Sequence, residues 1–115
     1  MTTQMRRAGT SIAANLAEGC GRHGDAELSR FCSISLGSAS ELQYFLLLAR
    51  DLQLLKSGDY DRLAEKTTEV KRMLTGFLHK LKAAGGALNA LQSKFQISLA
   101  MLRLAEDVAR LWATP

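Results

Sequence analysis

The sequence predicts an all-α fold, an antiparallel up-down bundle of four helices. Apolar residues recur at steps of three and four along four segments, and no segment alternates as a half-buried strand does. The composition agrees, because 47% hydrophobic and 6% aromatic residues with one proline in 115 residues are typical of a small helical domain. The same composition argues against a disordered or collagen-like chain. We therefore expect residues 1–115 to form a single domain.

The first helix is expected over about residues 3–18. One face is apolar and is expected in the core: Met5, Ala8, Ile12 and Leu16. Another face carries a polar stripe: Gln4, Arg7, Ser11, Asn15, Glu18 and Arg22. Arg7 and Glu18 are too far apart to pair within one helix, so we expect the partners of this stripe on another helix or subunit. Gly19, Gly21 and Gly24 are expected to end the helix, since glycine adopts the left-handed conformation freely.

The second helix is expected over about residues 25–55, with Asp25 as its N-cap. Its core seam consists of small and apolar residues: Leu28, Cys32, Ser35, Ala39, Leu42, Leu46 and Ala49. Another apolar stripe lies about a third of a turn away: Ile34, Phe45, Leu48 and Leu52. The run from Tyr44 to Ala49 is apolar on every side. Since such a helix must be covered all round, we expect it to lie in a subunit interface as well.

The third helix is expected over about residues 59–82, capped by Asp59. Its seam follows the same spacing: Leu63, Thr67, Val70, Leu74, Phe77 and Leu81. Residues 83–93, which include Gly85 and Gly86, are interpreted as a linker. The fourth helix is expected over about residues 94–112 and buries five apolar residues: Ile97, Met101, Leu104, Val108 and Leu111.

Several motifs resemble those of the four-helix-bundle family of 23S rRNA intervening-sequence proteins. They are Gln4-Met-Arg-Arg-Ala, Ser11-Ile-Ala-Ala-Asn-Leu-Ala-Glu-Gly19, Gly21-Arg22, Glu27, Arg30-Phe31, Leu36-Gly37-Ser38-Ala39, Glu41-Leu42 and Arg72-Met73-Leu74. The resemblance covers about residues 4–82. It implies a self-associating bundle, with a ring-shaped pentamer favoured, and a role around nucleic acid. Related bundles include the accessory proteins of diversity-generating retroelements, which assist a reverse transcriptase, and that role is an alternative here.

The order of the helices departs from that family's pattern. Family members carry a further helix before the Gln4–Arg7 segment, and residues 95–115 look like that helix moved to the other end. The chain thus resembles a circular permutant, natural or engineered, whose Gly85-Gly86 segment joins the old ends. The alternative is a carboxy-terminal helix of unrelated origin.

Basic residues are the first functional candidates. Between Lys71 and Arg103 the charged residues are all basic, and the formal net charge is +4. Lysine and arginine neutralise phosphates, so we expect binding of structured RNA or other nucleic acid through these side chains: Arg6, Arg7, Arg22, Lys71, Arg72, Lys80 and Lys82. The alternative is that they form ordinary solvated faces. Most phenylalanines lie on core stripes, so base stacking has little support.

A subunit interface is the second candidate. It is expected to include polar stripe residues and the apolar side of the second helix: Gln4, Ser11, Asn15, Glu18, Ile34, Tyr44, Phe45, Leu48 and Leu52. For the polar stripe we favour a role in fixing the register of helices or subunits over ligand binding, and Glu41 is expected to contribute similarly. A purely structural scaffold that binds nothing is a further alternative.

Catalysis has no support in the sequence. His23 and His79 are far apart, Cys32 falls on a core stripe, and nothing near Cys20 would activate it. We therefore expect no enzyme activity, metal site, cofactor or small-molecule substrate. No stretch approaches the roughly 20 apolar residues of a membrane span. With no signal pattern and two unpaired cysteines, a cytoplasmic protein is expected.

Overall fold

The computed structural model describes residues 1–22, 24–82 and 87–110, apart from the side chains of residues 87–95. It contains four helices, α1 (Thr2–Cys20), α2 (Asp25–Asp51), α3 (Ser57–Lys82) and α4 (Ala87–Arg110). No strand occurs in these described ranges. The predicted all-α bundle of four helices is confirmed.

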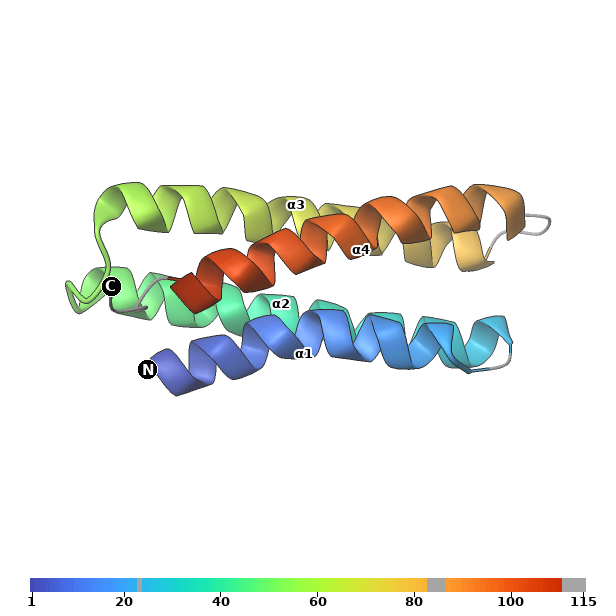
Figure 1. The fold of residues 1–115 in the computed structure, drawn as a ribbon, viewed down its shortest axis with the longest axis horizontal. Coiled ribbons are helices and arrows are strands. Elements are labelled where there is room, and N and C mark those ends of the chain that lie inside the picture. Colours follow the sequence, from blue (N-terminus) through green and yellow to red (C-terminus); the bar gives the residue numbers. More distant parts are fainter. Residues whose placement is uncertain (23, 83–86, 111–115) are drawn as a thin grey trace.

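The helices pack in cyclic order, so that each contacts the helices before and after it, and α4 returns to α1. Cross-helix contacts show that neighbours run antiparallel. On α1 and α2, Arg7 meets Glu41 while Ser11 meets Ser38. Figure 1 shows the resulting bundle, which measures 47 × 21 × 20 Å. The start of α1 and the end of α4 lie at the same end as the α2–α3 connection (Figure 1).

The core is the set of apolar stripes that the spacing predicts. All four expected residues of α1 and all seven of α2 are buried. In α3, Leu63, Thr67, Val70, Leu74 and Phe77 are buried, whereas Leu81 at the end of the seam is half-buried. In α4, Ile97, Met101, Leu104 and Val108 are buried, and Leu111 lies outside the described residues.

The end of α2 differs from the prediction. The helix ends at Asp51 rather than near residue 55, because Gln53 adopts a left-handed conformation with φ of 60°. The Gln53 N–H donates to the Arg50 carbonyl at 3.0 Å, and the Leu54 N–H donates to the Ala49 carbonyl at 2.9 Å. These two bonds form a Schellman motif, which satisfies the last helical carbonyls. Leu52 therefore lies in the turn beyond the helix.

The helix starts also differ. Gly24 with φ of 97° is the N-cap of α2, so Asp25 is its first helical residue and not the cap. Asp59 lies in the first turn of α3, which begins at Ser57. Gly19 lies inside α1, and Gly21 has the right-handed φ of −81°, so of the three glycines only Gly24 uses a left-handed conformation.

The expected linker over residues 83–93 is too long. Residues 83–86 lie outside the described ranges, but α4 begins at Ala87 and already includes residues 87–93. Residues 87–93 include two alanines and two leucines, which are strong helix formers, and the linker prediction gave more weight to Gly85 and Gly86 than to this preference. In the parts of the chain that the structure describes, no helix combines the length and apolar character that a bilayer crossing requires.

Candidate functional site

The predicted polar stripe of α1 packs against α2 through a cluster that we call the α1–α2 polar seam: Arg7, Ser11, Asn15, Ser35, Ser38 and Glu41. The Ser11 and Ser38 hydroxyls lie 2.9 Å apart, and Arg7 Nη2 lies 2.9 Å from Glu41 Oε1. The fully buried Ser35 hydroxyl donates to the Ile12 carbonyl at 2.7 Å. The two helices are therefore linked by polar contacts at three positions along their length. For Arg7 and Ser11 these contacts confirm the expectation that the partners of the stripe lie on another helix.

Other members of the stripe find partners within α1. The Asn15 amide donates to the Ser11 carbonyl at 2.8 Å and to the Ser11 hydroxyl at 2.9 Å. Glu18 pairs with Arg22 at 2.8 Å, one turn further along, so its expected partner on another helix is wrong. Gln4 is exposed. Arg22, the last residue of the stripe, lies at the i,i+4 spacing from Glu18 that favours such pairs, so this spacing was the signal for the pair in the sequence.

The α1–α2 polar seam links the two helices, and its buried polar groups find their partners within the bundle. Among the described residues, every buried side-chain nitrogen and oxygen has a hydrogen-bond partner. The Arg7–Glu41 pair is largely exposed, so it contributes at most about 1 kcal/mol. The buried Ser35 bond matters more, since leaving a buried hydroxyl unpaired costs about 1–3 kcal/mol.

Gly19 permits a close approach between α1 and α2. A Cβ atom at this position would lie 2.8 Å from Phe31 Cβ and 3.2 Å from Leu28 Cδ1. The guanidinium carbon of Arg30 lies 4.4 Å from the centre of the Phe31 ring, and that of Arg22 lies 5.5 Å from it. The glycine that ends the Ser11–Gly19 motif therefore serves helix packing, together with the Arg30-Phe31 motif of α2.

Replacing Gly19 with alanine is expected to lower the free energy of unfolding by about 1 kcal/mol. The clash between the new methyl group and Phe31 Cβ costs about 1–3 kcal/mol, and the gain in helix propensity of roughly 1 kcal/mol offsets only part of it. Gly76→Ala in α3 is the matched control, because a Cβ there has no neighbour within 4 Å. Urea denaturation should show this control gaining about 0.5–1 kcal/mol. An equal gain in both variants would contradict the packing argument.

The predicted basic residues do not form one patch. Arg6 and Arg7 begin α1, whereas Arg22 follows its end, about 24 Å away at 1.5 Å per residue. Arg6 lies near the end of α4, where its Nη2 donates to the Ala109 carbonyl at 3.4 Å. Arg7 and Arg22 are engaged in ion pairs. The structure therefore does not bring these three arginines together.

The basic residues of α3 do lie together, in the second half of the helix. Its first half carries four acidic residues and two basic ones: Asp59, Asp61, Glu65 and Glu69 against Arg62 and Lys66. Its second half carries exposed basic residues, which we call the basic half of α3: Arg72, His79, Lys80 and Lys82. Lys71 contacts α2, because its Nζ donates a hydrogen bond to Gln43 Oε1 at 2.9 Å. The helix thus has an excess of acidic residues in its first half and of basic residues in its second half.

The outward face of α2 exposes large apolar side chains. Tyr44 is 61% exposed and Leu47 is 42% exposed, and we call this pair the α2 ridge. Ile34 and Leu52 are also exposed, as an interface would require. Phe45 and Leu48 are half-buried, and Phe45 packs against the core. Sequence reasoning thus missed Leu47, which the apolar run around it concealed.

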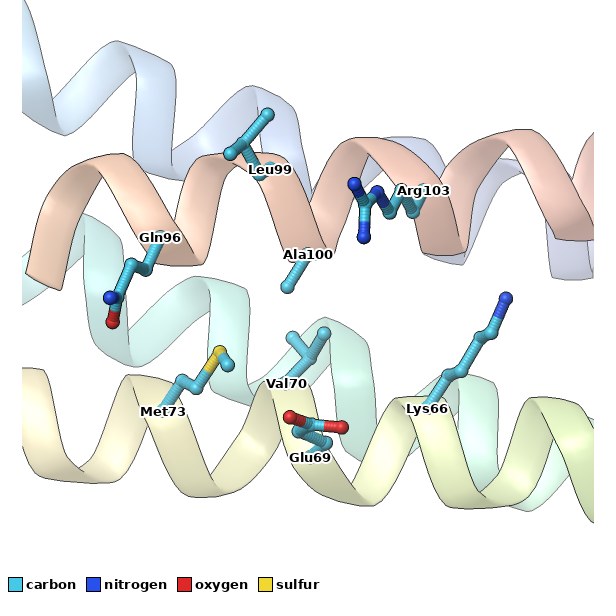
Figure 2. Close-up of a pocket in the computed structure, with 8 residues that line it drawn as sticks. All are labelled: Lys66, Glu69, Val70, Met73, Gln96, Leu99, Ala100 and Arg103. Atoms are coloured by element: carbon cyan, nitrogen blue, oxygen red, sulfur yellow. The ribbon is translucent and has the colours of Figure 1, made fainter.

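A groove lies between α3 and α4, with a volume of about 310 Å³. Figure 2 shows the side chains from the two helices that line this α3–α4 groove: Lys66, Glu69, Val70, Met73, Gln96, Leu99, Ala100 and Arg103. Val70, Met73, Leu99 and Ala100 make its apolar part. Lys66 is paired with Asp107, whereas Glu69 and Arg103 have no ion-pair partner among the described residues.

The thiols and imidazoles do not form a reactive centre in the described ranges. Burial raises the pKa of the Cys32 thiol to about 11, with a further contribution from Cys20, so Cys32 stays protonated at neutral pH. Cys20 and His79 are exposed, and His23 lies outside the described residues. No group of three potential metal ligands occurs in the part of the chain that the structure describes.

The family model of the 23S rRNA-intervening sequence proteins matches residues 1–76. The chain belongs to this family. In this 23S rRNA-intervening sequence protein the match covers α1, α2 and α3 as far as Gly76, so the α1–α2 polar seam and the α2 ridge lie within it. No curated protein and no solved structure matches the chain. Helix α4 lies outside the match, and the permuted order of helices stays a prediction.

Proposed function

We propose that this protein is a non-enzymatic, self-associating bundle that binds structured RNA or other nucleic acid through the basic half of α3. The uneven charge of α3 carries the proposal, because exposed basic residues gather in the second half of the helix, whereas in the first half acidic residues outnumber Arg62 and Lys66. Membership of a family described by 23S rRNA intervening sequences supports a nucleic-acid partner.

The basic half of α3 suits phosphate contacts. Arg72 and Lys82 are exposed, and no ion pair engages either side chain within the described structure. Cations that are not neutralised internally can displace the counterions condensed on a nucleic acid, which gives affinity without sequence preference. Several copies in one assembly would present several such surfaces, and linked sites bind a long polyanion more tightly than one site does.

Removing the two free charges is expected to weaken RNA binding. The double variant Arg72→Gln/Lys82→Gln should reduce the slope of log K against log salt concentration by about 2, since each lost phosphate contact lowers it by about 1. Lys56→Gln/Arg62→Gln removes two charges at the other end of the bundle and serves as the control. Binding of a structured RNA is measured by fluorescence anisotropy from low to moderate salt. Equal losses in both double variants would contradict the assignment to the basic half of α3.

A structural scaffold without a nucleic-acid partner is the second candidate. The pairing of Arg7 with Glu41 and of Arg22 with Glu18 favours it, because these arginines already serve the bundle. The same titration decides between the two functions. If the protein bound no RNA at low salt, the structural scaffold would be the remaining function.

A further inference from the structure

We infer that one backbone strand of a double-stranded RNA crosses α3 at Gly76, between the side chains of Arg72 and Lys80. The inference rests on the proposed function and names the class of nucleic acid and its place of contact. We call this surface, formed by Arg72, Thr75, Gly76, His79 and Lys80, the Gly76 saddle. All five residues are exposed.

The packing of the bundle does not require a glycine at position 76. A Cβ atom there would meet no heavy atom within 4 Å, whereas a Cβ atom at Gly19 would lie 2.8 Å from Phe31 Cβ. Gly76 also has no positive φ. A glycine inside a helix lowers its stability relative to alanine and leaves the main chain uncovered. What position 76 gains from glycine is therefore room for another molecule to approach the helix closely.

The side chains around Gly76 make a low floor between long cationic side chains. Residues three and four apart are neighbours on a helix, so Arg72 lies one turn before Gly76, and His79 and Lys80 lie one turn after it. The Thr75 hydroxyl donates to the carbonyl of residue 71 at 2.8 Å, which holds this short side chain against its own helix. From Arg72 to Lys80 the helix rises about 12 Å, a width that admits one sugar–phosphate strand.

The sequence around the saddle favours a polyanion. Between Glu69 of α3 and Glu106 of α4 the chain contains no aspartate or glutamate. Glu69 precedes Gly76 by two turns, about 10 Å along the helix axis. Residues 31–40 of α2, which include the contact of that helix with this half of α3, carry no charge either. A phosphate at the saddle therefore meets two flanking cations and no carboxylate from these segments.

The chemistry of the saddle suits the backbone of an RNA duplex. Proteins that bind single strands stack the bases on exposed aromatic rings, but Phe77 beside the saddle is only 1% exposed. Backbone contacts serve a duplex, whose bases are already stacked and paired. A main-chain carbonyl that accepts one helical hydrogen bond keeps a second lone pair, and the ribose 2′-hydroxyl can donate to it. DNA lacks this hydroxyl, so we expect an RNA duplex to bind more tightly than a DNA duplex.

Gly76→Gln tests the saddle because it fills the floor without changing the charge. Glutamine is a strong helix former, so the variant is expected to keep its helical circular dichroism and its resistance to urea. Its affinity for an RNA duplex of mixed sequence is expected to fall about tenfold, because the added side chain keeps the strand away from the helix. Gly58→Gln is the matched control, since Gly58 lies in the first turn of α3 and a Cβ atom there also meets nothing within 4 Å. This control is expected to bind as the unmodified protein does.

Fluorescence anisotropy with three probes distinguishes the outcomes: the RNA duplex, a DNA duplex of the same sequence and one RNA strand alone. We expect the RNA duplex to bind most tightly. Tighter binding of the single strand, or equal binding of the DNA duplex, would overturn the choice of double-stranded RNA.

The saddle and the proposed function fail in different ways. If Gly76→Gln bound the RNA duplex as tightly as the unmodified protein while Arg72→Gln/Lys82→Gln bound it weakly, the saddle would be wrong and the proposed function would stand. If the unmodified protein bound none of the three probes at low salt, the proposed function would be overturned, and this inference with it.

Discussion

Leu47→Glu is expected to convert the assembled protein into folded monomers. Leu47 is 42% exposed on the outward face of α2, so a glutamate there can remain hydrated in a single subunit. In an assembly the same carboxylate would be buried against apolar side chains without a partner, which is strongly unfavourable. Light scattering should show the subunit mass, and circular dichroism should show unchanged helical content.

The neighbouring residue provides the control for this prediction. Leu46 is 0% exposed and belongs to the core seam, so Leu46→Glu is expected to unfold the subunit itself. Loss of helical signal in both variants would show that Leu47 also supports the subunit core. Phe45 and Leu48 are less suitable positions than the sequence suggests, because both are half-buried.

Leu104→Ala in α4 is expected to lower the free energy of unfolding by about 2–5 kcal/mol. The side chain is 0% exposed and packs in the same core cluster as residues of α1, α2 and α3. Small domains have a total stability of about 5–15 kcal/mol, so this loss is a large fraction of it. The prediction matters because α4 lies outside the part of the chain that the family model matches.

Leu102→Ala is the matched control on the same helix. Leu102 is 54% exposed, so its truncation is expected to change the stability by less than about 0.5 kcal/mol. Both substitutions are measured by urea denaturation in the Leu47→Glu background, since association makes apparent stability depend on protein concentration. If Leu104→Ala cost no more than Leu102→Ala, α4 would not be an integral part of the bundle.

The sequence predicts the core well because burial follows helical periodicity. The seam of α2 from Leu28 to Ala49 is buried at every expected position, including the polar Ser35. Periodicity cannot identify the buried side of a helix that is apolar on all sides. For this reason it did not predict that Leu47 is exposed. Deciding which side of the run from Tyr44 to Ala49 faces outward requires the positions of α1 and α3.

Helix ends and charge pairs were harder to predict, for separate reasons. The Schellman motif after α2 uses Gln53 where glycine is the usual signal, so nothing in the sequence marks it. The partner of Arg7 depends on the register of α1 against α2 and so required the fold. Which basic residues lie together likewise depends on their positions along the bundle axis. Arg6 and Lys82 lie at opposite ends of this axis, and the order of residues in the sequence alone does not show this.

The arrangement of the helix ends determines where attachments can be made. The first residues of α1 and the last described residues of α4 emerge beside the α2–α3 connection, opposite the cationic end of α3 (Figure 1). A fluorescent protein or an affinity tag fused next to α1 or α4 at this end would therefore project away from a polyanion bound to the basic half of α3. In a closed assembly all such fusions would stand on one rim, so labelled copies can be counted without blocking the other rim.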